Sequence, residues 1–370
     1  MSLKLLFVAI ASVLCSVNLW SAPLGEYGQT NLVSNIPGLA AQTDPNLVNP
    51  WGVSASSTSP FWVSDNGTGL TTLYNTAGVP QSLVVTIPNP AGGASSPTGQ
   101  VFNGSGQFNN DIFIFATENG TIAGWRGALG TTAETLFNSS SSGAIYKGLA
   151  LATTGQGTYL LAADFHNNKI DVFPSSGAPS LAGNFVDPNL PAGYAPFNVQ
   201  NIGGQIYVAY AKQDAEGRDD APGMGNGFVS VFNLNGNFVK RLASNGFLNA
   251  PWGLALAPSG WGAVGGDLLV GNFGDGQINA FNLDGTFAGT LAGLNGLPVV
   301  NDGLWSLTFG NGGNGGNVNS LYITAGLNGE ADGLFARIDS VPEPDTFLLL
   351  AVGFTAFIIV PLRRRSTRNH

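Results

Sequence analysis

The sequence has few of the residues that most often perform catalysis or cross-link a fold. Its 370 residues include one cysteine and two histidines, and only 9% of them are charged. Cys15 lies in the N-terminal segment that we expect to be removed, so the mature protein has no disulfide and strands must close its fold. His166 is the only histidine apart from the C-terminal residue. A zinc site built from nitrogen and sulfur ligands is therefore excluded.

Basic residues are also scarce. Between the two terminal segments described below, residues 23–340 contain 8 basic and 20 acidic residues. Such an acidic core repels phosphate backbones, so nucleic acid is not an expected partner, whereas cations, sugars and basic proteins remain open. No glycine-rich phosphate loop leads into a helix, and no Gly-x-Ser-x-Gly elbow stands between a strand and a helix.

The two ends of the sequence are typical of targeting segments. Residues 1–22 hold Lys4, an apolar run over 5–17 and then Ser21 and Ala22, which predicts a secretory signal peptide and export by the secretion machinery. Near the other end, residues 346–362 carry no charge and are followed by three arginines. At about 1.5 Å per residue this run would form a helix of about 25 Å, so we expect a transmembrane helix with cytoplasmic arginines.

The C-terminal tail, residues 341–370, resembles a bacterial sorting signal. It has Pro-Glu-Pro, then the apolar run, then the arginine cluster, in the order of the PEP-CTERM signal of Gram-negative bacteria. The resemblance implies an exosortase-type membrane protease as a partner, which would cleave near Pro-Glu-Pro. An inner-membrane-anchored precursor would then become a cell-surface or extracellular protein; a plain membrane anchor is the alternative. The residues of this signal are Pro342, Glu343, Pro344, Arg363, Arg364 and Arg365.

The core is built from short apolar runs separated by glycine-rich turns. In residues 251–291, four such runs (253–257, 267–270, 277–281 and 286–291) predict a four-stranded antiparallel meander. Related units recur at intervals of 47 to 55 residues. This recurrence predicts an all-β fold, a six-bladed β-propeller with four-stranded blades over residues 23–340. The equivalent positions in the six repeats are Trp51, Thr98, Lys147, Phe197, Trp252 and Trp305.

The sixth repeat shows only three strands, of which the last covers residues 333–338. A spare apolar strand, residues 31–36, precedes the first repeat. We expect these two segments to pair, so that the N-terminal strand closes the ring and leaves no exposed edge.

The repeats resemble those of NHL-type propellers, and the core resembles an uncharacterised family of secreted bacterial proteins that carry this kind of tail. The resemblance covers roughly residues 31–338 and includes AsnProTrpGly at 49–52, AlaAspPheHisAsn at 163–167, AlaGlyTyrAlaProPheAsn at 192–198 and AspGlyLeuTrp at 302–305. It implies a fold and a destination, but no activity.

The polar turns after the second strand of each repeat are the candidate site. They share one face of a propeller with the connections between blades, where Trp51, Phe197, Trp252 and Trp305 would stack. Carboxylates, amides and aromatic rings around a channel mouth suit a sugar or a cation, so calcium is a candidate cofactor. The alternative is that Asp and Asn bond their own turns and that the tryptophans pack between blades. The candidate ligand or metal residues are Asp65, Asn66, Glu118, Asp164, His166, Asp214, Asn272, Asp275 and Glu330.

Three functions remain open from the sequence, and one of them is a scaffold that binds another protein on its face. The other two concern a ligand or substrate. The first is an exported, non-catalytic propeller that binds a ligand or extracellular polysaccharide at the cell surface, since catalytic side chains are scarce. The second is an enzyme, a calcium-dependent lactonase or sugar-active hydrolase that uses carboxylates at the channel mouth.

Overall fold

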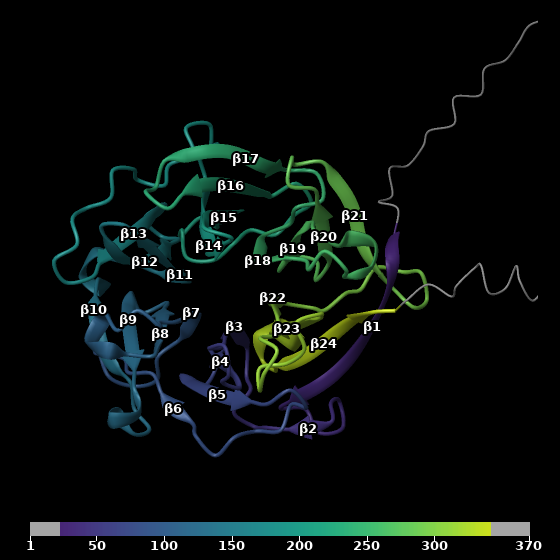
Figure 1. Cartoon of the computed structure of the whole chain (residues 1–370), viewed down its shortest axis with the longest axis horizontal. Coiled ribbons are helices and arrows are strands. Elements are labelled where there is room, and N and C mark those ends of the chain that lie inside the picture. The colour runs from purple at the N-terminus through teal and green to yellow at the C-terminus, as the bar shows by residue number, and fades with distance from the viewer. Residues whose placement is uncertain (1–22, 342–370) are drawn as a thin grey trace, which may run out of the picture.

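Five β-sheets surround one central axis in the computed structural model, which describes residues 23–341 (Figure 1). The first four sheets follow one another along the chain. The first sheet consists of β3 (Pro50–Ser54), β4 (Phe61–Asp65), β5 (Leu70–Tyr74) and β6 (Val85–Thr86), and the second of β7 (Pro97–Phe102), β8 (Phe113–Thr117), β9 (Thr121–Trp125) and β10 (Glu134–Asn138). The third sheet consists of β11 (Tyr146–Thr154), β12 (Gly157–Asp164) and β13 (Lys169–Pro174). The fourth consists of β14 (Tyr194–Ile202), β15 (Gln205–Lys212), β16 (Gly227–Asn233) and β17 (Phe238–Ser244).

The fifth sheet has nine strands and joins both ends of the described chain. Its main path runs through β18 (Pro251–Leu256), β19 (Leu268–Asn272), β20 (Ile278–Phe281), β21 (Phe287–Gly293), β1 (Pro23–Ser34), β24 (Leu334–Ser340), β23 (Ser320–Ala325) and β22 (Leu304–Phe309). The ninth strand, β2 (Gln42–Thr43), pairs with β1, and the short helix α1 (Leu327–Glu330) connects β23 to β24.

The hydrophobic core lies between neighbouring sheets. Strands such as β12 and β15 are buried on both faces, so their apolar residues form continuous runs rather than an alternating pattern. One cluster, for example, joins Leu161 of β12 to Val208 of β15. Each sheet is therefore stabilised by the sheets beside it, which is the packing expected of a propeller-like all-β protein.

The N-terminal strand pairs with the last strand, as the sequence predicts. In the antiparallel pairing of β1 with β24, Asn31 lies opposite Ala336 and Val33 lies opposite Phe335. The Ser34 hydroxyl also donates a 2.7 Å hydrogen bond to the carbonyl oxygen of Gly333. The two ends of the described chain consequently leave the ring on the same side (Figure 1).

The prediction of six separate four-stranded blades is wrong in two places. β1 begins at Pro23, well before the predicted strand, and its first residues pair in parallel with β21 through Thr290 and Leu291. This extra pairing merges the strands of the fifth and sixth repeats into one sheet of mixed direction. The third sheet has only three strands, because the segment after β13 contains Pro179, Pro188 and Pro191, and proline cannot donate to a strand ladder.

The transmembrane helix is also not part of the described fold. No helix within residues 23–341 is long and apolar enough to cross a membrane. The predicted span, 346–362, lies outside the described residues, as do the predicted signal peptide and the sorting-signal residues 342–344 and 363–365.

The innermost strands touch one another through glycines. A Cβ atom on Gly52 of β3 would lie 2.6 Å from the carbonyl oxygen of Thr98 on β7, and one on Gly253 would lie 2.6 Å from the carbonyl oxygen of Trp305. A Cβ atom on Gly99 would overlap the backbone nitrogen of Leu149 on β11. These glycines follow the repeat positions Trp51, Thr98 and Trp252, so the close approach between neighbouring strands recurs around the axis.

A methyl group at one of these contacts should be costly. We expect Gly99→Ala to destabilise the protein by about 2 kcal/mol or more, since it forces backbone against backbone in a packed core. Gly155→Ala is the matched control, because Gly155 lies in the turn after β11 with nothing within 4 Å of its Cβ position; its effect should stay within about 0.5 kcal/mol. Urea denaturation of both variants measures the difference. Equal stabilities would contradict the close approach.

Candidate functional site

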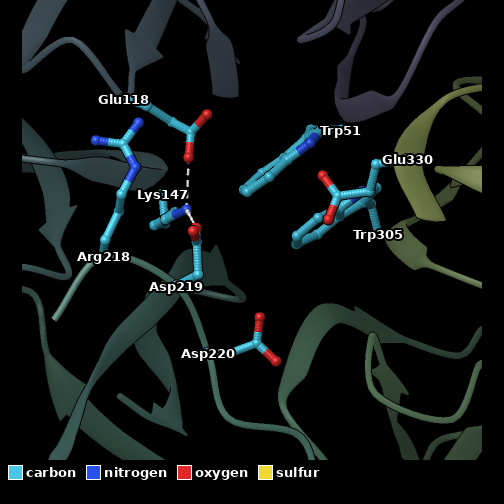
Figure 2. A pocket seen from close by; sticks show the side chains of 8 residues that line it. All are labelled: Trp51, Glu118, Lys147, Arg218, Asp219, Asp220, Trp305 and Glu330. Carbon is cyan, nitrogen blue, oxygen red and sulfur yellow. Dashed lines mark hydrogen bonds and ion pairs between the residues drawn. The ribbon is translucent and has the colours of Figure 1, made fainter. Parts of the chain in front are cut away.

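A cavity of about 210 Å³ opens at the end of the axis where the innermost strands begin (Figure 2). Three of its residues come from innermost strands, namely Trp51 on β3, Lys147 on β11 and Trp305 on β22. The others come from the turn after β8, the loop after β15 and α1. The lining residues are Trp51, Glu118, Lys147, Arg218, Asp219, Asp220, Trp305 and Glu330.

Stacked aromatic rings form the floor of this cavity. The ring centroids of Trp51 and Trp305 are 3.5 Å apart with an interplanar angle of 20°, and Phe273 stacks on Trp305 at 4.2 Å. Trp252 packs edge-on against both tryptophans. Trp51 and Trp305 are almost fully buried, so the stack blocks the axis and gives the cavity a rigid base.

A buried lysine stands on this floor and binds two carboxylates. Lys147 Nζ lies 2.5 Å from Glu118 Oε1, 2.9 Å from Asp219 Oδ1 and 5.2 Å from the centroid of the Trp51 ring. Burial alone would lower the pKa of Lys147, but the charges of Glu118 and Asp219 outweigh it and raise the pKa. The lysine therefore stays charged.

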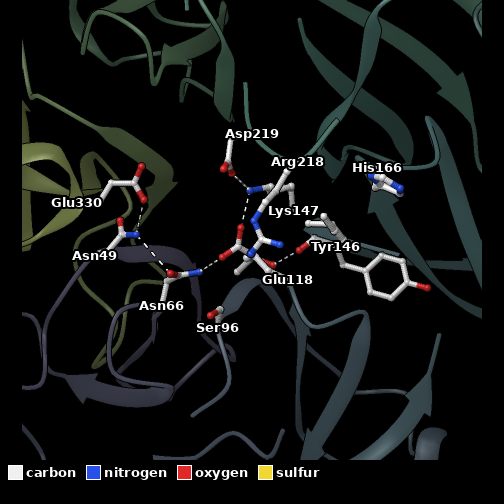
Figure 3. Close-up of polar contacts among 12 residues, drawn as sticks. Asn49, Asn66, Ser96, Glu118, Tyr146, Lys147, His166, Arg218, Asp219 and Glu330 are labelled. Carbon is white, nitrogen blue, oxygen red and sulfur yellow. Dashed lines mark hydrogen bonds and ion pairs between the residues drawn. The ribbon is translucent and has the colours of Figure 1, made fainter. Parts of the chain in front are cut away.

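A chain of hydrogen bonds extends this ion pair around the cavity (Figure 3). Asn66 Nδ2 donates to Glu118 Oε2 at 3.0 Å, and Asn49 Nδ2 donates to Glu330 Oε2 at 2.6 Å. Asn49 Oδ1 in turn accepts a 3.0 Å bond from the indole nitrogen of Trp305. The polar rim and the aromatic floor are thus one connected structure, which fixes the positions of the side chains that face the cavity.

Two carboxyl groups of the cavity resist ionisation. Burial raises the pKa of Asp220 to about 7, against the opposing charge of Lys147. One buried oxygen of Asp220, Oδ2, has no hydrogen-bond partner within residues 23–341. Burial also raises the pKa of Glu330, although the hydrogen bond from Asn49 opposes the shift. The cavity therefore holds a carboxyl group that can carry a proton near neutral pH, beside carboxylates that Lys147 neutralises.

The loop between β15 and β16 brings Arg218, Asp219 and Asp220 to the cavity. Backbone bonds hold its base, from Ala221 N to the Lys212 oxygen and from Asp214 N to the Asp219 oxygen, both at 2.8 Å. His166 lies outside the cavity, where its ring nitrogen Nδ1 is 3.2 Å from the carbonyl oxygen of Gly217 on the same loop. The loop is thus a fixed part of the site wall.

The structure brings three of the nine candidate residues together. Asn66, Glu118 and Glu330 belong to the hydrogen-bonded rim described above, whereas the other six lie elsewhere. Asp65 is fully buried between strands, and burial raises its pKa well above the usual value. Asp164, Asp214, Asn272 and Asp275 bond their own or adjacent loops, and His166 is exposed beside the loop after β15.

Four residues of the site were not among the candidates: Lys147, Arg218, Asp219 and Asp220. Lys147 carried a usable signal, because a lysine occupies a repeat position that holds Trp or Phe in four of the six repeats. A lone cation on an innermost strand needs carboxylate partners. The expanded acidic loop at 213–226 is the longest of the polar turns and supplies one of them.

The donor set does not fit calcium as it is arranged. Calcium takes about six to eight oxygen ligands at about 2.3–2.6 Å, but the ammonium group of Lys147 lies between Glu118 and Asp219, where a cation would bind. Within residues 23–341, no group of three or more His, Cys, Asp or Glu side chains is placed to hold a metal ion.

The chain belongs to a protein family with members in Acanthamoeba polyphaga mimivirus. It is 36% identical to the mimivirus protein R648 over 322 residues, covering 83% of this chain and 78% of R648. It is 35% identical to mimivirus protein L690, covering 75% of this chain and 77% of L690. Both relatives are named only as uncharacterised proteins, and no protein-family model matches the sequence.

Solved structures support the propeller-like fold. An α-L-arabinofuranosidase of Fusarium graminearum, in complex with arabinobiose, superposes with a TM-score of 0.53 at 10% identity, covering 85% of this chain and 98% of that one. Regucalcin of Agrobacterium tumefaciens, a calcium-binding protein, superposes with a TM-score of 0.51 at 9% identity, covering 87% and 98%. At such identities the likeness concerns the fold alone.

The ion pair at Lys147 makes a testable contribution to stability. We expect Lys147→Met to lower the free energy of unfolding by about 3 kcal/mol, because it leaves Glu118 charged and partly buried without its cationic partner. Adding Glu118→Gln to this variant should restore much of the loss. Asp219→Asn should cost less than about 1 kcal/mol, because the side chain of Asp219 is 59% exposed. Urea denaturation checks all three; a Lys147→Met variant as stable as the wild type would contradict the assignment.

Proposed function

We propose that the protein is an exported propeller that binds a small polar ligand in the cavity at the channel mouth. The observation that carries this proposal is the combination of a rigid aromatic floor, a buried lysine held by two carboxylates, and an unpartnered carboxyl oxygen on Asp220. A polar atom without a protein partner at a preformed cavity favours a ligand that can form a hydrogen bond to it in place of water.

The charges around the cavity favour an uncharged or positively charged ligand. Lys147 and Arg218 face four carboxyl groups, those of Glu118, Asp219, Asp220 and Glu330. The whole chain has a formal net charge of −9, so its field also disfavours an anion. Hydroxyl groups on a saturated ring would suit this rim, since they can donate to carboxylates and accept from Arg218. A sugar or an aminosugar is therefore the ligand class we propose.

Three sugars that share one ring but differ in charge test this proposal. We expect glucosamine and glucose to bind more tightly than glucuronate, which places a carboxylate against the acidic rim. Arg218→Ala and Asp220→Asn should each weaken binding about tenfold, as loss of one hydrogen bond to a charged group does. Asp284→Asn, a change at an exposed turn remote in sequence from the cavity loops, is the matched control. Isothermal titration calorimetry measures the affinities; tightest binding of glucuronate, or no binding of any of the three, would contradict the proposal.

A second candidate is a sugar-active hydrolase or lactonase that uses the same cavity. Asp220 favours it, because a carboxyl group with a pKa of about 7 can act as a general acid near neutral pH. It would give its proton to the leaving-group oxygen as the bond from that oxygen to the reacting carbon breaks, while a water molecule adds to that carbon and loses a proton to a carboxylate of the rim. Two solved proteins of similar fold are complexes with arabinobiose, so this architecture can accommodate a sugar.

The hydrolase hypothesis makes a distinct kinetic prediction. Activity on aryl glycosides or lactones should fall as pH rises through about 7, since Asp220 then loses the proton it must donate. Asp220→Asn should lower kcat by at least about 100-fold, the usual contribution of a general acid.

Calcium dependence is tested in the same assay. The arrangement of Lys147 predicts activity that survives chelation by EDTA, and complete loss with EDTA would show that calcium binds after all.

Export and sorting through the terminal segments remain part of the proposal. Support comes from the sequence of residues 1–22 and from the Pro-Glu-Pro, apolar and arginine order of the tail. In a bacterial host with an exosortase, mass spectrometry of the released protein should show the loss of a segment of about the mass of residues 345–370. A full-length tail on the released protein would refute the processing step.

A further inference from the structure

A second and larger cavity lies at the opposite ends of the same innermost strands. Its volume is about 500 Å³, and its walls include the last residues of β3 and β7 and the middle or end of β11, β14 and β22. Lys147 lines the first cavity and Leu151, four residues later on β11, lines the second. At about 3.3 Å per residue, the two cavities are roughly 13 Å apart along the strand.

The innermost strands separate the two cavities. Between them lie Gly52, Gly99 and Gly253, at which neighbouring strands approach too closely for a Cβ atom. The stacked rings of Trp51 and Trp305 close the axis on the side of the first cavity. A ligand in one cavity consequently cannot reach the other, and the second cavity needs its own explanation.

The chemistry of the second cavity differs from that of the first. No charged side chain is among its lining residues in the described part of the chain. Val101 and Leu151 supply apolar surface. The Gln200 amide and the Thr308 hydroxyl are partly exposed and make no side-chain hydrogen bond within residues 23–341.

Another polar side chain of this cavity, that of Gln100, already has hydrogen-bond partners within the protein, which distinguishes it from Gln200 and Thr308. The Gln100 side chain donates to the Gly52 oxygen at 2.8 Å and to the Trp62 oxygen at 3.0 Å, and it accepts a 3.0 Å bond from the Ser54 hydroxyl. Gln100 therefore serves the fold. Gln200 on β14 and Thr308 on β22 come from different sheets and offer donors and acceptors on two walls of the cavity.

We propose that this second cavity is a binding site for an uncharged carbohydrate, independent of the ligand at the first cavity. A primary amide can donate to one sugar hydroxyl and accept from the next, a hydroxyl group can do both, and aliphatic side chains pack on the C–H face of a sugar ring. Since no titratable group lines the site, binding is independent of pH between 5 and 9 and insensitive to salt. Both properties distinguish it from the first cavity, where Asp220 titrates.

Isothermal titration calorimetry of the full chain with neutral oligosaccharides tests the proposal. The four oligosaccharides are maltotriose, cellobiose, xylobiose and arabinobiose. We expect at least one to bind at pH 5, 7 and 9 with the same affinity. Gln200→Ala and Thr308→Val should each weaken binding about tenfold, whereas Arg218→Ala and Asp220→Asn should leave it unchanged. Gln205→Ala is the matched control, since Gln205 is an exposed glutamine at the start of β15.

Three results would overturn the proposal. They are the absence of binding by all four sugars at millimolar concentration, binding that Gln200→Ala and Thr308→Val leave intact, and binding that only Arg218→Ala or Asp220→Asn removes. The last result would assign the sugar to the first cavity and support the proposed function while removing this inference.

Discussion

The direct backbone contact between innermost strands is the constraint on which the rest of the structure depends. Where Gly99 meets Leu149, there is no room for a side chain, so the strands are held at a fixed separation. Side chains then bond the backbone of the neighbouring sheet: Thr98 Oγ1 donates to the Tyr146 oxygen, and Asn198 Nδ2 to the Trp252 oxygen, both at 2.7 Å. Such bonds satisfy carbonyl groups that no strand ladder reaches, because the innermost strand of each sheet has a free edge.

The charged cavity follows from this narrow centre. Large rings cannot enter between strands in backbone contact, so Trp51, Trp252 and Trp305 stack at the end of the axis and form a floor. Lys147 occupies the equivalent position on β11, and its backbone oxygen accepts a 3.0 Å bond from the indole nitrogen of Trp252. Its ammonium group lies over the face of Trp51, where a cation is attracted by the ring. The carboxylates of Glu118 and Asp219 neutralise the charge of this buried ammonium group.

The sequence was sufficient for most of the inner strands and for the pairing of the two chain ends, because the apolar runs and turn residues that mark these strands are local features. It was not sufficient for the merged sheet. The first residues of β1 form the parallel pairing with Thr290 and Leu291, a contact between segments far apart in the chain that no local pattern encodes. The missing strand of the third sheet was foreseeable, since three prolines follow β13.

The candidate site was only partly predictable for a related reason. The turn positions of Asn66, Glu118 and Glu330 follow from the repeat, but whether a turn residue faces the axis depends on which backbone groups near it lack partners. Asp164 accepts bonds from the backbone of Ile145 and Asn167, so it is used locally. Lys147 bonds carboxylates that follow strands of the two adjacent sheets, and the one from the loop after β15 is 72 residues away in the chain.

The placement of β1 has a consequence for how the chain reaches this state. Ser34 of β1 bonds a carbonyl group 299 residues further along, so β1 cannot pair with β24 until the chain has been made as far as β24. The nine-stranded sheet is completed only by contacts of very large sequence separation, and such contacts slow folding. Until then the unpaired edges of β21 and β24 stay open to other chains. The pairing of β1 with both strands is what covers these edges in the folded protein.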